Sequence, residues 1–230
     1  MEKVIDNFSE RKEFGNLDAN IRFLNKTALI NKQIKILEIG SGTGSLLNYF
    51  HSRDYDIRGV EINKSRIEDS KHLHGNLPLE PVTSEVLPFP DNSFDVVISF
   101  DVFEHIPDSD QHLQEVKRVL KPGGFYLLQT PNKLTNVIFE TIRWKSFTKW
   151  QADHCSLHSY WSIVRRFRKN SFEEITFYDI PVVTKFFKIK IKKYLGKMGL
   201  FVLKIINPDK LPLSLRTNFY ITARNQTKIR

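Results

Sequence analysis

The sequence predicts an α/β fold in which helices cover both faces of a parallel sheet. Two observations carry this prediction. Between residues 17 and 130, short stretches rich in β-branched residues alternate with amphipathic stretches of helical period, which is the pattern of repeated β-α-β units. Glycine and proline turns separate these stretches. Sheets of this kind bind ligands at the carboxyl ends of their strands.

The first elements surround a glycine-rich turn. Residues 17–31 carry apolar side chains at helical spacing and predict an amphipathic helix. Residues 34–40, IKILEIG, form an apolar run that stops at glycine, as a buried parallel strand does. Residues 40–44 then predict a turn, and residues 45–53 predict the helix that follows it.

Two more strands and two more helices are expected in the middle of the chain. Residues 57–62 predict a strand, and residues 65–73 predict a helix. A loop with several turn residues leads into an apolar strand at 94–100. Residues 109–120 form an amphipathic helix, and KPGG at 121–124 is expected to stop it.

A strand is expected at 125–130, and the pattern becomes looser beyond Pro131. Strands are then expected at 172–180 and 218–224, and a helix at 161–169. Residues 185–206 alternate lysine with apolar residues. We expect one domain over residues 1–230, because 230 residues bury a sizeable core without disulfides or structural metal.

The composition of the chain indicates the cellular compartment in which we expect the protein. Cys155 is the single cysteine, which excludes an intramolecular disulfide and fits a reducing, cytoplasmic compartment. No stretch of the sequence approaches the ~20 consecutive apolar residues that span a bilayer, so we expect that the protein is not an integral membrane protein. The net charge of +9 is uneven, because residues 181–230 hold twelve Lys or Arg against one acid, Asp209.

The glycine turn and the next strand predict a cofactor that contains a nucleoside. Gly40, Gly42 and Gly44 let the backbone turn sharply and approach a ligand closely. Glu61, at the end of the next strand, can accept hydrogen bonds from both hydroxyls of a ribose.

A nicotinamide or flavin dinucleotide is the competing cofactor, because it uses a similar turn and acid. Its G-x-G-x-x-G pattern requires glycine where this chain has Ser45. The negative charge of Glu38 also opposes a pyrophosphate, whereas it suits the ammonium and sulfonium groups of S-adenosylmethionine (SAM). The residues therefore favour a cationic cofactor.

These motifs resemble the class I SAM-dependent methyltransferases, particularly ubiquinone-biosynthesis O-methyltransferases and small-molecule or sugar methyltransferases. The resemblance covers residues 35–133 and implies a Rossmann-like, mostly parallel seven-stranded sheet with an antiparallel last strand. The segments that carry it are ILEIGSGTG at 36–44, GVEI at 59–62, SEVLPFPDNSFDVVISFDVFEHIPD at 84–108 and RVLKPGGFYLLQTPN at 118–132.

The resemblance also implies the residues around SAM. It places Glu61 on the ribose and Ile62 against the adenine. Thr83 and Ser84 stand where the family has Asp and Ala, which weakens the expected contact to the adenine amino group. The other residues expected to line the cofactor are Glu38, Gly40, Ser41, Gly42, Gly44, Ser99, Phe100 and Asp101.

Methyl transfer needs alignment of acceptor, methyl and sulfur rather than a covalent nucleophile or a metal. A hydroxyl acceptor benefits from a base, and His105, His154 and His158 are the candidates, each of which also has a purely structural interpretation. A zinc site made of Asp153, His154, Cys155 and His158 is the less favoured alternative, because a single short loop lacks a second ligand pair.

Two insertions interrupt the family pattern. The first, at about 132–160, is long and aromatic and is expected to supply substrate contacts from Arg143, Trp144 and Tyr160. The second, at about 182–215, interleaves lysines with apolar residues. It suits either packing on the sheet or peripheral contact with the inner face of an anionic membrane.

The sequence thus predicts a methyltransferase that acts on a hydroxyl of a small molecule or glycan, in surface-polysaccharide or natural-product biosynthesis. An RNA methyltransferase and a noncatalytic SAM-binding protein are the alternatives. Nucleic acid is the less favoured partner, because no RNA-binding module accompanies the basic residues. A monomer and a homodimer both fit the sequence.

Overall fold

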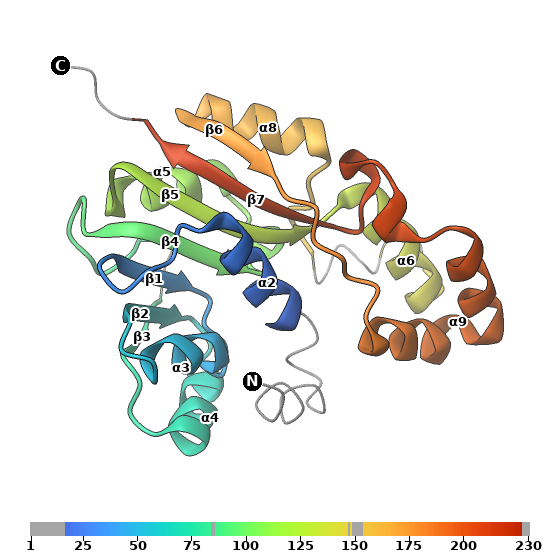
Figure 1. Cartoon of the computed structure of the whole chain (residues 1–230), viewed down its shortest axis with the longest axis horizontal. Coiled ribbons are helices and arrows are strands. Elements are labelled where there is room, and N and C mark those ends of the chain that lie inside the picture. The colour runs from blue at the N-terminus through green and yellow to red at the C-terminus, as the bar shows by residue number, and fades with distance from the viewer. Residues whose placement is uncertain (1–16, 84–85, 147, 149–153, 227–230) are drawn as a thin grey trace.

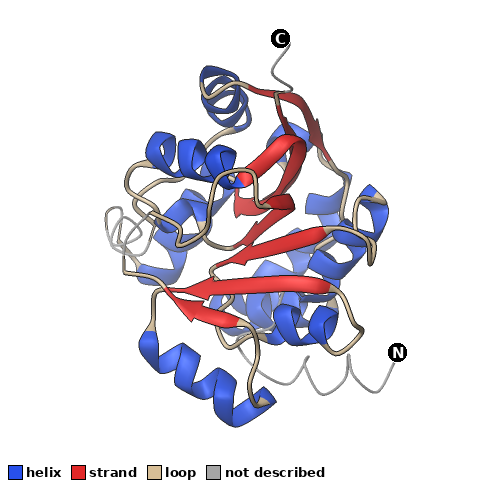
Figure 2. Ribbon diagram, turned by 90° about the vertical axis from the view of Figure 1, so that its left-hand side faces the viewer, coloured by secondary structure: helices blue, strands red, loops and turns tan. Residues whose placement is uncertain are grey.

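The computed structural model describes residues 17–83, 86–146, 148 and 154–226. These residues form one seven-stranded sheet with helices on both faces (Figures 1 and 2). The strand order is β3-β2-β1-β4-β5-β7-β6, and β7 runs antiparallel to both of its neighbours. The predicted fold class is therefore confirmed, including the antiparallel last strand.

Six of the seven strands fall close to predicted stretches, and β3 was not predicted. They are β1 (Lys35–Ile39), β2 (Asp56–Glu61), β3 (Leu79–Pro81), β4 (Phe94–Phe100), β5 (Leu120–Pro131), β6 (Phe172–Phe177) and β7 (Asn218–Asn225). The helices and 3-10 turns are α2 (Leu17–Thr27), α3 (Ser45–His51), α4 (Lys64–His74), η1 (Phe103–His105), α5 (Ser109–Val119), α6 (Lys133–Trp144), α8 (Tyr160–Lys169), α9 (Lys185–Ile205), η2 (Pro208–Lys210) and η3 (Leu213–Leu215).

Alternate residues of each central strand enter different cores. Leu37 of β1 belongs to the core under α5 and α8, whereas its neighbour Ile36 belongs to the core under α2 and α3. The same alternation separates Leu128 from Leu127 on β5. This is the two-residue period of a sheet buried on both faces.

Three predicted boundaries were wrong. The first helix ends at Thr27 rather than at residue 31, and β6 ends at Phe177 rather than at residue 180. The KPGG turn does not precede β5 but lies within it, because Leu120 already pairs with Phe94. The side chain of Asn225 supports this first part of β5, since its Nδ2 donates to the carbonyls of Leu120 and Lys121 over 3.2 and 3.1 Å.

The strand order reverses between β1 and β4. From β1 the chain moves outward to β2 and β3, and it then returns to the other side of β1 as β4. The carboxyl ends of β1 and β4 are therefore the topological switch point, where open α/β sheets bind their ligands.

Candidate active site

The turn after β1 has the conformation that its three glycines allow. Gly40, Gly42 and Gly44 have φ values of 72°, 55° and 77°, in the left-handed region that favours glycine. A Cβ atom at Gly40 would overlap Val102, and one at Gly44 would overlap Ser70, whereas none at Gly42 would come closer than 4.0 Å to another described atom. Gly40 and Gly44 thus serve packing, and Gly42 borders open space.

Glu61 connects this turn with the end of β2. Its Oε2 accepts a hydrogen bond from the backbone N–H of Gly42 over 2.7 Å, and its Oε1 accepts one from Asn63 over 2.9 Å. A carboxylate has about four acceptor sites, so both oxygens can also accept the hydroxyls of a ribose. The adjacent Ile62 is 67% exposed, which fits a side chain that covers a bound ring.

Glu38 is the second acid of this site. It lies on β1 with only 6% of its surface exposed, and its Oε2 has no hydrogen-bond partner among the described residues. Burial raises the pKa of Glu38 to about 7, and the negative charge of Glu61 adds to the rise. A buried carboxylate oxygen without a donor fits a ligand that brings a positive charge. The residues present therefore fit SAM.

Three residues at the end of β4 were expected to line the cofactor, and two of them, Ser99 and Phe100, contact other side chains of the protein. The hydroxyl of Ser99 is buried and lies 2.6 Å from the hydroxyl of Tyr126, and Phe100 packs edge-on against Phe23. Asp101 has a φ of 53°, and its N–H donates to Gln129 Oε1 over 3.0 Å. This left-handed conformation, rare for a non-glycine residue, presents Asp101 at the switch point.

Gln129, which accepts a hydrogen bond from the backbone of Asp101, is a buried polar residue that the sequence analysis did not single out. It is fully buried on β5, and its Nε2 has no partner within the described part of the chain. The apolar strand around Gln129 gave no sequence signal for it.

Three other residues were expected around the cofactor: Ser41, Thr83 and Ser84. The hydroxyl of Ser41 donates to the Glu38 carbonyl over 3.3 Å. Thr83 is exposed just after β3, and Ser84 lies outside the described residues.

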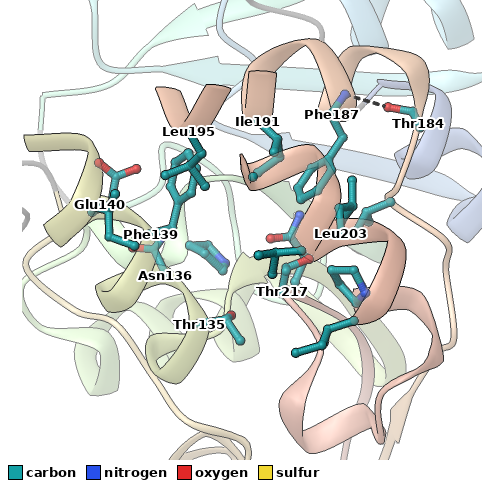
Figure 3. A pocket seen from close by; sticks show the side chains of 18 of the residues that line it. Thr135, Asn136, Phe139, Glu140, Thr184, Phe187, Ile191, Leu195, Leu203 and Thr217 are labelled. Atoms are coloured by element: carbon teal, nitrogen blue, oxygen red, sulfur yellow. Dashed lines mark hydrogen bonds between the residues drawn. The ribbon is translucent and has the colours of Figure 1, made fainter. Parts of the chain in front are cut away.

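A cavity of about 650 Å³ opens beside Asp101, between α6 and α9 (Figure 3). Its wall is mostly apolar, with contributions from Phe139 and Ile142 of α6 and from α9. The α9 residues in the wall are Phe187, Ile191, Leu195, Met198, Gly199, Val202 and Leu203. The cavity has the size and lining of a small-molecule site.

The polar residues that line the cavity include Asp101, which directly follows β4, and also Glu104 and His154. Glu104 is buried, and its Oε2 accepts a hydrogen bond from Thr130 Oγ1 over 3.0 Å. Burial raises the pKa of Glu104 well above its usual range, and the charge of Asp101 raises it further. A carboxyl group that titrates nearer neutral pH can take up a proton there.

The three candidate histidines have different surroundings. His154 borders the cavity, and the ring centroids of His154 and His105 lie 5.1 Å apart. His158 is buried elsewhere, with Nε2 within 3.3 Å of Ser109 Oγ and its ring against Phe103. Burial lowers the pKa of His158 to about 4. This position favours a structural role for His158.

Of the zinc set considered from the sequence, Asp153 lies outside the described residues, and within the described part of the chain Cys155 and His158 do not belong to the group of possible metal ligands that comes together. A different trio comes together: one donor atom each from Glu104, His105 and His154, all within 4.8 Å of one another.

The predicted substrate residues are only partly described. Tyr160 packs on Phe177 with ring centroids 4.4 Å apart and borders a different hollow from the cavity beside Asp101. Arg143 and Trp144 belong to α6, but their side chains lie outside the described ones.

Comparison with known proteins agrees with this geometry. A family model described as a methyltransferase domain matches residues 37–128. A probable SAM-dependent methyltransferase from Mycolicibacterium smegmatis is 37% identical over 107 residues, which cover 44% of this chain and 39% of that protein. A ubiquinone/menaquinone biosynthesis C-methyltransferase from Hahella chejuensis is 34% identical over 153 residues, which cover 59% of this chain and 61% of that protein.

Solved structures share the fold over nearly the whole chain. A putative sarcosine dimethylglycine methyltransferase from Galdieria sulphuraria superposes with a TM-score of 0.62 at 18% identity, over 95% of this chain and 89% of that one. The match to the two curated relatives covers less than two thirds of their lengths. The glycine turn, Glu61 and the end of β4 all lie within residues 37–128, the part of this chain that is similar to the methyltransferase-domain family and to SAM-dependent methyltransferases, and the fold around them is shared with solved methyltransferase structures.

Proposed function

We propose that this protein transfers the methyl group of SAM to a hydroxyl of a small molecule whose apolar part occupies the cavity between α6 and α9. One observation carries the proposal: Asp101 belongs both to the switch point and to the cavity wall. A cofactor held by the glycine turn and a molecule in the cavity would meet there. The mostly apolar wall favours an acceptor with an apolar body over a free sugar.

SAM supplies an activated methyl group, so the chain has to orient the acceptor, exclude water and receive a proton. The apolar side chains of α6 and α9 exclude water from the acceptor end of the cavity. Glu104 is the base that the geometry favours, because it borders the cavity and its pKa is raised. His154 borders the same space and is the second candidate.

The residues of the glycine turn have separate tasks in this proposal. Glu61 holds the turn through Gly42 and offers its remaining acceptor sites to the ribose. Glu38 balances the positive charge of the amino acid part of SAM. The acceptor's identity and pathway, surface-polysaccharide or natural-product biosynthesis included, stay predictions.

Calorimetric titration with S-adenosylhomocysteine tests the cofactor. We expect micromolar binding and no binding of NADH, and we expect Glu61→Ala to weaken binding about 10- to 100-fold because charge-assisted hydrogen bonds to the ribose are lost. Glu80→Ala is the matched control, since Glu80 lies on the neighbouring strand β3 and pairs with Arg58. Absence of binding, or a preference for NADH, would overturn the proposal. Saturation with SAM but no turnover of any acceptor would indicate a noncatalytic SAM-binding protein.

A further inference from the structure

The second half of α9 has an apolar band on its outer surface. Met198, Phe201, Val202 and Ile205 are 75%, 61%, 48% and 68% exposed. Their spacing of three, four and seven residues places them along one face of the helix. Exposed apolar residues that adjoin in this way are unusual on a soluble protein and mark an interaction surface.

This band lies at the cavity. Met198 and Val202 line the cavity and are also about half exposed or more. The opposite wall repeats the arrangement, because Leu134, Ile138 and Ile142 of α6 are 44%, 63% and 49% exposed at intervals of four residues. Ile142 again lines the cavity. Apolar surface therefore continues from the outside into the cavity on both helices.

A kink gives α9 this shape. Gly196 has φ 62° and ψ −155°, which interrupts the helix. Beyond it, the second half lies against the first, since a Cβ atom at Gly199 would overlap Leu195 and Ile191. The first half directs Phe187, Ile191 and Leu195 into the cavity (Figure 3). The second half is thus held at the cavity, with Met198 and Val202 in the cavity wall and Phe201 and Ile205 exposed outside it.

Basic residues accompany the band. Five lysines of α9 have exposed side chains: Lys188, Lys192, Lys193, Lys197 and Lys204. The helix contains no acidic residue. The next acid along the chain, Asp209, accepts hydrogen bonds from the backbone N–H groups of Val182 and Val183. The helix therefore combines exposed apolar side chains with positive charge.

We propose that α9 docks on an anionic lipid bilayer and that acceptors with an apolar chain pass from the bilayer into the cavity. Lysines attract anionic headgroups, and the apolar band inserts at the headgroup boundary. Docking of α9 on the α9 helix of a second copy would bring together two helices that carry lysines and no acids, which disfavours that occupant. No described helix is long and apolar enough to cross a bilayer, so the contact is peripheral. The part that concerns the acceptor rests on the proposed function, whereas the docking does not.

Sedimentation of the full chain with vesicles tests the docking. We expect binding to vesicles of phosphatidylglycerol and phosphatidylcholine at low salt, and at least 10-fold weaker binding to phosphatidylcholine alone. The variants are Phe201→Ser with Ile205→Ser, and Lys193→Glu with Lys197→Glu; none of these four residues lines the cavity. Each pair should weaken binding at least 10-fold. Lys64→Glu with Lys71→Glu makes the same charge change on α4 and should alter binding less than 2-fold.

Titration of each variant with S-adenosylhomocysteine separates this proposal from the proposed function. Unchanged titration shows that the variant is folded, so lost vesicle binding then supports docking by α9. Failure of the unaltered chain to bind anionic vesicles overturns the docking even if the cofactor binds. Equal vesicle binding by all variants overturns it as well. Self-association in sedimentation equilibrium that Phe201→Ser with Ile205→Ser abolishes would assign the band to a second copy instead.

Discussion

The backbone N–H of Gly42 donates to the Glu61 carboxylate over 2.7 Å, so the turn after β1 and the acid that ends β2 form one structural unit. The other carboxylate oxygen of Glu61 accepts from Asn63, which begins α4 as its N-cap. The acid is thus fixed before any ligand arrives. Because its orientation is set by backbone donors, the site does not have to reorganise a side chain in order to bind a ribose.

The raised pKa of Glu38 leads us to expect that the affinity for the cofactor depends on pH. This pKa is raised to about 7, and only the carboxylate form attracts the positively charged ammonium group of the ligand. Below about pH 7 binding must first remove the proton from Glu38, so affinity for S-adenosylhomocysteine should fall up to about 10-fold per pH unit and level off above about pH 8. Glu38→Gln should bind weakly and with little pH dependence. Calorimetry at pH 6, 7 and 8 measures this, and an unchanged pH profile in Glu38→Gln would contradict it.

The glycines of the turn should respond differently to alanine. Gly40→Ala adds a methyl group that overlaps Val102, so we expect a loss of about 2–4 kcal/mol of unfolding free energy from the left-handed backbone and the overlap together. In Gly42→Ala the new methyl group comes no closer than 4.0 Å to another described atom, and the substitution should cost only about 1 kcal/mol. It should nevertheless weaken cofactor binding, because its methyl group enters the space that Gly42 borders. Chemical denaturation and calorimetry on both variants separate the two effects.

The overlap at Gly40 can be tested by compensation. Gly40→Ala combined with Val102→Ala should recover part of the lost stability, because the smaller side chain removes the overlap with the new methyl group. Additive losses in the double variant would show that the cost at Gly40 comes from the backbone conformation alone.

Asp101 should control the protonation of Glu104. The negative charge of Asp101 is one cause of the raised pKa of Glu104, so Asp101→Asn should lower that pKa. Burial remains, and the pKa of Glu104 should therefore stay above its usual range. Titration of the labelled Glu104 carboxyl carbon by NMR measures the shift. Asp54→Asn on the exposed turn after α3 is the control, and an equal shift in both variants would refute the coupling.

The sequence predicted the central strands and the glycine turn well, because buried parallel strands leave continuous apolar runs and sharp turns require glycine. The edge strand β3 went unpredicted, since a three-residue strand that ends in proline has no distinctive pattern. The alternation of lysine and apolar residues from 185 onward did not indicate a helix. The kink at Gly196 explains this in part, because no single helical period runs through both halves of α9.

The candidate base could not have been selected from sequence alone. His154 and His158 are four residues apart in a loop, and what places them differently is how that loop is tied to the sheet. The N–H of Ser156 donates to the Glu104 carbonyl over 2.9 Å, and Asn132 forms a bridge with His158. These long-range contacts bury His158 and leave His154 beside the cavity. The raised pKa of Glu104 likewise depends on burial, which no local motif reports.

His112 gives a final prediction, for stability. Burial lowers its pKa to about 4, and its Nε2 lies 3.1 Å from the Tyr126 hydroxyl. In the unfolded chain a histidine has a pKa of about 6.5, so between these values the unfolded state binds the extra proton. The stability that the neutral ring contributes is complete above about pH 6.5 and is lost as the pH falls toward 4, by about 3 kcal/mol in all.

A comparison of two variants isolates this contribution of His112. The raised pKa values of buried carboxyl groups act in the opposite direction, but their effect is the same in both variants and cancels. The unfolding free energy of the unaltered protein minus that of His112→Gln should therefore decrease by about this amount between pH 7 and pH 4. Denaturant titrations at four pH values measure the difference, with His72→Gln on the exposed side of α4 as the control variant. A constant difference for His112→Gln would contradict the prediction, because it would mean that the ring has the same pKa in the folded and in the unfolded chain.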